Sequence, residues 1–160
     1  ALRDTLIHIT NEPERFSLKW PNDVLMDECK IAGILLETCG VGPSHLSIGI
    51  GVNLSVVPES NKIENLATPP TCLGIKILPM DFLKILANYL AIRLNDFNAS
   101  GFEKTRLDWL KSAANIGRTI TARMPNSEIV GKFVTVDEEG ALVLKADDIV
   151  HSIHAADIFF

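Results

Sequence analysis

The spacing of apolar residues at the start of the chain predicts one helix followed by a sheet. Apolar positions recur at helical intervals within Ala1–Thr10, with Arg3 and Asp4 on the other side. Pro13 disfavours helix at the residue before it. We therefore expect the helix to end there and Phe16–Trp20 to open the sheet.

Two further strands, Asp23–Met26 and Cys29–Thr38, are predicted on either side of a polar turn at Asp27-Glu28. The second strand contains Ile31–Leu36, a continuous apolar run. Such a run is expected of a strand that is covered on both faces. The two strands are predicted to form a hairpin.

The next segments predict one more strand and a loop. Gly40–Pro43 is rich in turn residues, and His45–Leu54 alternates apolar with small residues as a strand does. Pro58–Pro70 is polar and has no period, so we interpret it as a surface loop that could cover a ligand.

Two helices are predicted in the middle of the chain. Pro79–Phe97 has the clearest helical period, and Ser100–Glu103 has the spacing of a capping box that begins a second helix through about Ala114, before the stop signal Asn115–Gly117. We interpret Trp109 as core-packed rather than ligand-stacking, because aromatics at helical spacing usually serve the core. The apolar stripe of the first helix consists of Phe82, Leu83, Leu86, Leu90, Leu94 and Phe97.

From Arg118 onward, short β-type runs alternate with turn residues, which is typical of a small β-barrel. The expected strands are Arg118–Met124, Glu128–Asp137, Ala141–Ala146, Ile149–His154 and Ile158–Phe160. We therefore place a domain boundary near Gly117, with residues 1–116 forming an α+β domain and residues 117–160 a small barrel.

Candidate chemistry is concentrated around the predicted hairpin. Lys19 and Lys30 flank Asn22 and Asp23, and a buried lysine is costly unless an anion meets it. Two lysines suit a ligand with a carboxylate and phosphates, while Asn and Asp can hold a hard cation such as Mg²⁺. The residues therefore point to activation of a carboxylate by ATP.

Three motifs in order carry a family resemblance. Lys19-Trp20-Pro21-Asn22-Asp23, then Lys30-Ile31-Ala32-Gly33-Ile34-Leu35-Leu36-Glu37, and then Gly49-Ile50-Gly51-Val52-Asn53 resemble the second half of the catalytic domain of biotin protein ligases. The tail, including Gly131 and Asp137-Glu138-Glu139-Gly140-Ala141-Leu142, is similar to the SH3-like C-terminal domain of the same ligases.

The resemblance implies a mixed or antiparallel sheet with packed helices, followed by the SH3-like barrel. It also implies a two-step reaction in which biotin and ATP form biotinyl-5′-AMP and a lysine of a biotin carboxyl carrier protein domain then attacks it. Lys30 and Asp23 would be catalytic, Lys30, Gly33 and Gly49 would bind biotin, and Lys19, Asn22, Asp23 and Asn53 would bind Mg-ATP. Asn22 is the expected Mg²⁺ ligand.

Two departures from the family pattern stand out. Ala155-Ala156-Asp157 replaces the usual Ala-Gly-Asp, and no counterpart of the family's Gly/Arg-rich loop precedes Lys19. We therefore expect about half of the catalytic domain to be missing and the activity of this polypeptide alone to be in doubt. A Gly-Arg-Gly-Arg-like stretch upstream of Ala1 in the reading frame would support the resemblance.

Composition narrows the class of protein. The 160 residues carry a net charge of −5, which argues against general affinity for nucleic acid, and no apolar run approaches a membrane span. Three cysteines without a CxxC pair predict neither a disulfide framework nor a zinc site. Leu54 stands where a dinucleotide fingerprint needs its third glycine. We expect a cytoplasmic protein that could form a homodimer.

Three functions stay open at this stage. The favoured one is a biotin protein ligase represented by its C-terminal portion. The second keeps the fold without the reaction, as a lipoate-type ligase relative or an inactive carrier-binding remnant. The third is a non-catalytic β-barrel interaction module.

Overall fold

A computed structural model describes residues 1–38, 45–57 and 68–160 and has an α+β fold with two antiparallel sheets. The turn predicted at Gly40–Pro43 and most of the loop predicted at Pro58–Pro70 lie outside these residues. The first part contains α1 (Leu2–Thr10), a short 3₁₀ turn (Pro13–Arg15), β1 (Phe16–Lys19), β2 (Asp23–Met26), β3 (Cys29–Thr38), β4 (Leu46–Val52) and α2 (Pro79–Leu110). The second contains β5 (Thr119–Met124), β6 (Ser127–Val136), β7 (Leu142–Ala146), β8 (Ile149–Ile153) and β9 (Asp157–Phe159).

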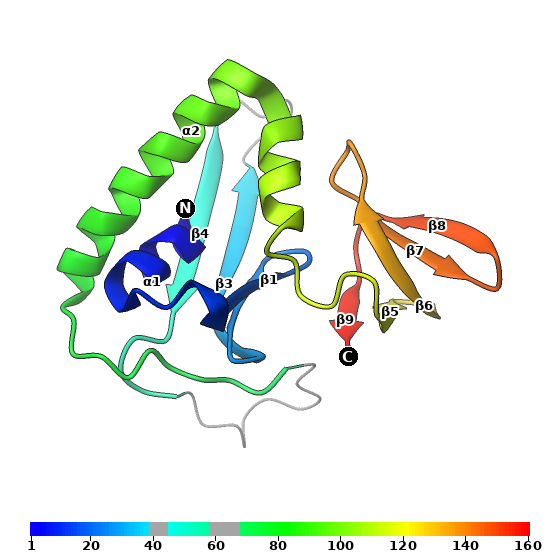
Figure 1. Ribbon diagram of the computed structural model, residues 1–160, viewed down its shortest axis with the longest axis horizontal. Coiled ribbons are helices and arrows are strands. Elements are labelled where there is room, and N and C mark those ends of the chain that lie inside the picture. The colour runs from blue at the N-terminus through cyan, green and yellow to red at the C-terminus, as the bar shows by residue number, and fades with distance from the viewer. Residues whose placement is uncertain (39–44, 58–67) are drawn as a thin grey trace.

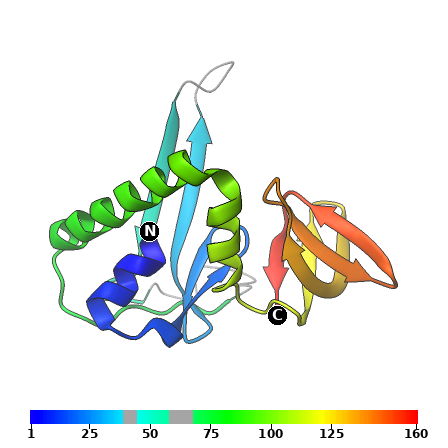
Figure 2. The ribbon, with the colours of Figure 1, turned by 45° about the horizontal axis from the view of Figure 1, so that its top comes forward.

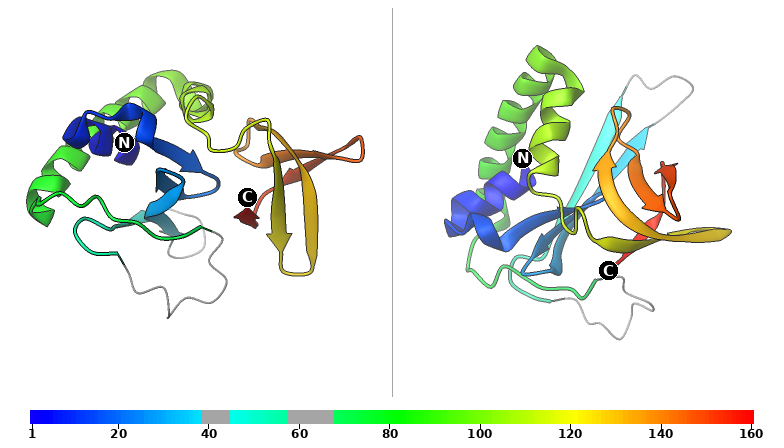
Figure 3. Two further views of the ribbon diagram at one scale, coloured as in Figure 1. Left: turned by 60° about the horizontal axis from the view of Figure 1, so that its bottom comes forward. Right: turned by 45° about the vertical axis from the view of Figure 1, so that its right-hand side comes forward.

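The first sheet has the order β1-β2-β3-β4, and both helices cover one of its faces (Figures 1 and 3). The hairpin between β2 and β3 begins and ends as predicted, because Asp27 and Glu28 adopt the positive φ angles that a tight two-residue turn requires. The buried side chains between sheet and helices include Leu6 of α1, Val24 of β2, Ile31 of β3 and Phe82 of α2. This core fixes the register of the hairpin.

The prediction that Ile31–Leu36 is covered on both faces was wrong. Ile31 and Ala32 are buried, whereas Leu35 and Leu36 are each 58% exposed. Leu35 lies on the same face of β3 as Gly33, opposite the face that packs on the helices, so no helix covers it. Leu36 belongs to the end of the β3–β4 hairpin, which extends beyond the part of the sheet that carries the helices (Figure 2). Hydrophobic sequence alone does not reveal where the covering layer ends.

Helix α2 unites the two predicted helices across a kink at Gly101, whose φ of 70° and ψ of −168° are not helical. The second helical segment ends at Leu110 rather than Ala114, and its Glu103 pairs with Arg106 at 2.7 Å. The predicted apolar stripe is only partly a core face. Phe82 and Leu86 are buried on the sheet, but Leu83, Leu94 and Phe97 are 46–52% exposed.

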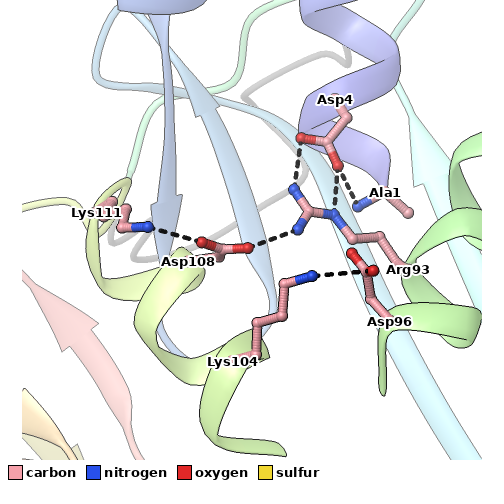
Figure 4. Close-up of polar contacts among 7 residues, drawn as sticks. All are labelled: Ala1, Asp4, Arg93, Asp96, Lys104, Asp108 and Lys111. Carbon is pink, nitrogen blue, oxygen red and sulfur yellow. Dashed lines mark hydrogen bonds and ion pairs between the residues drawn. The ribbon is translucent and has the colours of Figure 1, made fainter. Parts of the chain in front are cut away.

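An ion-pair network holds the kinked helix against α1 (Figure 4). Arg93 donates two hydrogen bonds to the Asp4 carboxylate, at 2.8 and 3.1 Å, and one to Asp108 beyond the kink at 3.0 Å. Burial opposes the ionisation of Asp4, but the hydrogen bonds and positive charges of Arg93 and the Ala1 ammonium together outweigh it and hold the pKa of Asp4 below its ordinary value. The network therefore connects three helical segments through one guanidinium.

The second sheet has the order β8-β7-β6-β5-β9. All five predicted strands are present within one or two residues of their predicted ends. Residues 118–160 are described throughout, and in them the sheet is curled but open, with β8 and β9 as its edges (Figure 3). Its core consists mainly of inward-facing residues of this sheet such as Phe133 and Leu144.

Trp20, which lies between β1 and β2 of the first sheet, also belongs to the core of the second sheet. It is 7% exposed, and its indole N–H donates to the carbonyl of Gly140 at 3.0 Å. Trp109 packs partly buried against the same cluster, which agrees with its interpretation as a core residue. The two sheets are thus joined through a residue of the Lys19–Asp23 motif.

No helix in the described part of the chain is long and apolar enough to cross a membrane. Cys29 and Cys72 are free thiols, and Cys39 lies outside the described residues.

Candidate active site

The candidate site forms at the closed end of the β1–β2 hairpin. Lys19 and Asp23 are cross-strand partners, and Asp23 is in turn the partner of Gly33 on β3. Side chains of cross-strand partners lie on the same face of a sheet. Because the helices cover the face that carries Val24 and Ala32, Asp23 and Gly33 belong to the opposite, open face.

Lys30 and Asp23 form an ion pair with Nζ 2.7 Å from Oδ1. A register irregularity after Val24 pairs Lys30 with Leu25 and so places Lys30 on this open face. A Cβ atom on Gly33 would lie 3.3 Å from Asp23 Oδ1 and 3.4 Å from Lys30 Nζ. Glycine at position 33 therefore leaves room for the pair, and a side chain there would press on it.

Lys19, not Lys30, is the buried lysine of the site. Lys19 is 5% exposed, whereas the side chain of Lys30 is 40% exposed. The Lys19 ammonium donates to Thr68 Oγ1 at 2.6 Å. Burial lowers the pKa of Lys19, which Asp23 and Asp157 oppose and the neighbouring Lys30 charge reinforces.

Thr68 reaches Lys19 because the 69–71 segment is bonded to the start of β3. The amide of Lys30 donates to the carbonyl of Pro69 at 2.8 Å, and the amide of Thr71 donates to the carbonyl of Lys30 at 2.9 Å. These bonds fix the 69–71 segment beside the β2–β3 hairpin. Thr68 lies in the loop Pro58–Pro70 that we expected could cover a ligand, but no sequence pattern singled out this residue.

Two hydrogen bonds hold Asn22 to Ile34 of β3. Its Nδ2 donates to the carbonyl of Ile34 at 2.7 Å, and the amide of Ile34 donates to the carbonyl of Asn22 at 2.9 Å. These bonds use the amide nitrogen of the side chain and leave its oxygen, an acceptor, for another partner. Asn22 is exposed next to Asp23, so both can face a bound ligand.

Four predicted site residues line one cavity of about 350 Å³, namely Lys19, Asn22, Asp23 and Lys30. Thr68 and residues 156–159 of the second sheet complete its wall. The family resemblance implies that the tail lies beside the active site, but sequence reasoning named none of these second-sheet residues as site residues. One local signal was the resemblance of Ala155-Ala156-Asp157 to the family's Ala-Gly-Asp.

The predicted site residues Gly33, Gly49 and Asn53 do not line this cavity. Gly49 pairs with Leu35, two residues along β3 from Gly33, whose own partner is Gly51. Gly49 lies on the same open face as Gly33, because its partner Leu35 is two residues from Gly33 and side chains alternate between the two faces along a strand. Asn53 Nδ2 donates to the carbonyl of Thr71 at 2.9 Å, so its side chain secures the 71–73 segment.

Two lysines and one carboxylate in a part-covered cavity can bind an anion and stabilise developing negative charge. Unit charges 4 Å apart interact by about 1 kcal/mol in water but by about 4 kcal/mol at an effective dielectric constant of 20. Among the described residues, no three His, Cys, Asp or Glu side chains are grouped as a metal site. The chemistry that these residues supply is electrostatic.

Two regions of the chain match protein-family models. Residues 5–53 match the "Biotin/lipoate A/B protein ligase family" and residues 116–160 match the "Biotin protein ligase C terminal domain". A biotin–[acetyl-CoA-carboxylase] ligase of Paracoccus denitrificans is 39% identical over all of this chain and 69% of its own length. The bifunctional ligase/repressor of Bacillus subtilis is 32% identical over 88% of this chain and 45% of its own.

Solved structures agree on the fold. The apo biotin protein ligase of Aquifex aeolicus superposes with a TM-score of 0.83 at 24% identity, covering 98% of this chain and 70% of that one. The same enzyme in complex with biotin and ATP gives a TM-score of 0.77 at 25% identity, covering 98% and 66%. The identity to the Paracoccus ligase over the full length of this chain, together with the two matched regions, shows that the chain belongs to the biotin protein ligase family.

Proposed function

We propose that this chain carries out ATP-dependent biotin–protein ligation. Biotin and ATP would form biotinyl-5′-AMP with release of pyrophosphate, and a lysine amine of a biotin carboxyl carrier protein domain would then displace AMP. The observation that carries the proposal is the Lys30–Asp23 ion pair beside the buried Lys19 in one cavity, in a chain whose Paracoccus relative is a biotin–[acetyl-CoA-carboxylase] ligase.

The lysines would stabilise negative charge during the first step. Lys30, partly exposed and level with Gly33, would contact the biotin carboxylate and the reacting phosphate, and Lys19 would add positive charge on the nucleotide side. Gly33 and Gly49 would let biotin approach the open face of β3 and β4. No enzyme nucleophile is needed, because the acyl group passes through the adenylate.

Asn22 and Asp23 are the residues that would hold Mg²⁺ with ATP. The side-chain oxygen of Asn22 and the carboxylate oxygen of Asp23 that does not meet Lys30 are hard donors, which suits a magnesium ion otherwise bound by phosphates and water. When bound, Mg²⁺ would neutralise charge on the phosphates. Asn53 would face the nucleotide with its side-chain oxygen, because its Nδ2 is bonded to the carbonyl of Thr71.

Substituting Lys30 tests the proposal directly. We expect Lys30→Ala to slow biotin-dependent pyrophosphate release by at least ~100-fold, which corresponds to about 2.7 kcal/mol of lost charge stabilisation. The assay is run on the chain alone and on the chain extended by any sequence that its reading frame encodes before Ala1. Lys84→Ala is the matched control, because Lys84 also pairs with an aspartate but lies exposed on α2.

Three outcomes would count against the proposal. Wild-type rates of pyrophosphate release in Lys30→Ala would remove Lys30 from the site. Release that requires lipoate in place of biotin would favour the lipoate-type relative. Carrier binding without any adenylate in either form of the chain would favour the inactive remnant.

A further inference from the structure

The buried Lys19 ammonium touches the second sheet as well as the first. Its Nζ lies 5.0 Å from the ring centroid of Phe160, which follows β9, and 2.6 Å from Thr68 Oγ1. A cation over an aromatic face is attracted by the ring quadrupole, and more strongly when water is excluded. The ring therefore covers a charge that the first sheet does not cover by itself.

A second contact places β9 beside Lys19. Trp20, the next residue, is inserted into the core of the second sheet and bonded to the carbonyl of Gly140. The short strand β9 is in turn fixed to β5 by pairing and by the buried Ile158. Adjacent residues of one motif thus have partners in the second sheet, Trp20 in its core and Lys19 at its edge.

Charge in β9 reinforces this contact. Asp157 lines the same cavity as Lys19, and its carboxylate acts on the Lys19 ammonium together with that of Asp23, against the repulsion from Lys30. Asp157 is the cross-strand partner of Arg123 in the pairing of β9 with β5, so its backbone is fixed. The second sheet therefore supplies both a ring and a negative charge to one lysine of the first.

We propose that Phe160, assisted by Asp157, is a positioning residue for Lys19 on the nucleotide side of the site. This deepens the proposed function and rests on it, since Lys19 matters to catalysis only if the cavity binds ATP. Phe160 contacts the lysine and not the reacting atoms. Its effect is to hold the ammonium in one place and keep water from it.

Selective acylation of lysines measures the covering of Lys19 without any activity. The intact chain is treated with limiting acetic anhydride at pH 8, and the modification of Lys19 and Lys30 is followed by peptide mass spectrometry. We expect Phe160→Ala to raise the rate at Lys19 about fivefold and to leave Lys30 within twofold of its wild-type rate. Phe160→Tyr, which keeps the ring, is expected to restore slow labelling.

Two further variants separate the ring from other causes. Phe160→Leu keeps apolar bulk but removes the ring, and we expect Lys19 labelling between those of Phe160→Ala and the wild type. Phe97→Ala removes a similarly exposed phenylalanine from α2, and it should leave Lys19 labelling unchanged. A thermal melt of each variant shows whether the substitution has destabilised the second sheet.

Kinetics then connect the contact to function. If the chain activates biotin, Phe160→Ala should raise the KM for ATP about fivefold and leave the KM for biotin within twofold. Unchanged Lys19 labelling in Phe160→Ala overturns the contact itself. Increased labelling with an unchanged KM for ATP overturns the positioning role. A chain that never uses ATP refutes the proposed function, and the labelling result still decides whether Phe160 covers Lys19.

Discussion

Replacing Trp20 with phenylalanine tests whether the Lys19–Asp23 motif is built into the second sheet. Trp20 is 7% exposed and donates to the carbonyl of Gly140 at 3.0 Å. Phenylalanine keeps an aromatic ring but loses that hydrogen bond and part of the volume. The substitution therefore removes one specific contact between the two sheets.

The expected loss follows from two contributions. The missing hydrogen bond costs about 1 kcal/mol, because the Gly140 carbonyl loses its indole partner in a part-buried position. The smaller ring leaves unfilled space in a cluster that includes Phe133 and Leu142, which costs about 1–2 kcal/mol more. We expect Trp20→Phe to lower the free energy of unfolding by about 2–3 kcal/mol.

Urea denaturation followed by far-UV circular dichroism measures this loss, with a decrease in Tm of about 4–10 °C in a thermal melt. Trp109→Phe is the matched control, because Trp109 packs on the same cluster but is only partly buried. We expect it to cost less than about 1 kcal/mol. The reasoning is refuted if Trp20→Phe destabilises the chain no more than Trp109→Phe does.

Two further substitutions test the ion-pair network and the second sheet. Arg93→Met should lower the free energy of unfolding by about 2 kcal/mol above pH 5, because Arg93 bonds Asp4 and Asp108 at once from a partly exposed site. The pKa of Asp4 is depressed in the folded chain, so this stabilisation is complete above the unfolded pKa and is lost as pH falls through the folded one. Urea midpoints for Arg93→Met and the wild type should therefore converge below about pH 4, and a constant difference down to pH 3 would contradict the assignment. Gly131→Ala should cost about 1–3 kcal/mol, because a Cβ there would lie 2.9 Å from the carbonyl oxygen of Lys145 on the neighbouring strand. Gly51→Ala, whose Cβ would find its nearest atom at 4.0 Å, should cost clearly less in the same urea titration, and equal losses would show that crowding is not the cause.

The sequence by itself determined the local elements of this protein. The β2–β3 hairpin was predicted to the residue, because its turn residues and the apolar runs beside it are adjacent in the chain. The short strands after Arg118 were predicted for the same reason. Three motifs in register identified the family, which the relatives and the family models then showed.

Only the tertiary structure decided what covers each element. Lys19 is buried because Thr68 and Phe160 reach it from 49 and 141 positions away, and no local pattern encodes either contact. Leu35 is exposed because its face of the sheet carries no helix, and Leu36 is exposed because the sheet extends past its helices, although their run resembles a buried strand. Periodicity specifies which residues share a face of a strand or helix, whereas the layer that packs on that face depends on contacts between distant segments. Trp20 is the clearest case, since it lies in the motif of one sheet and in the core of the other.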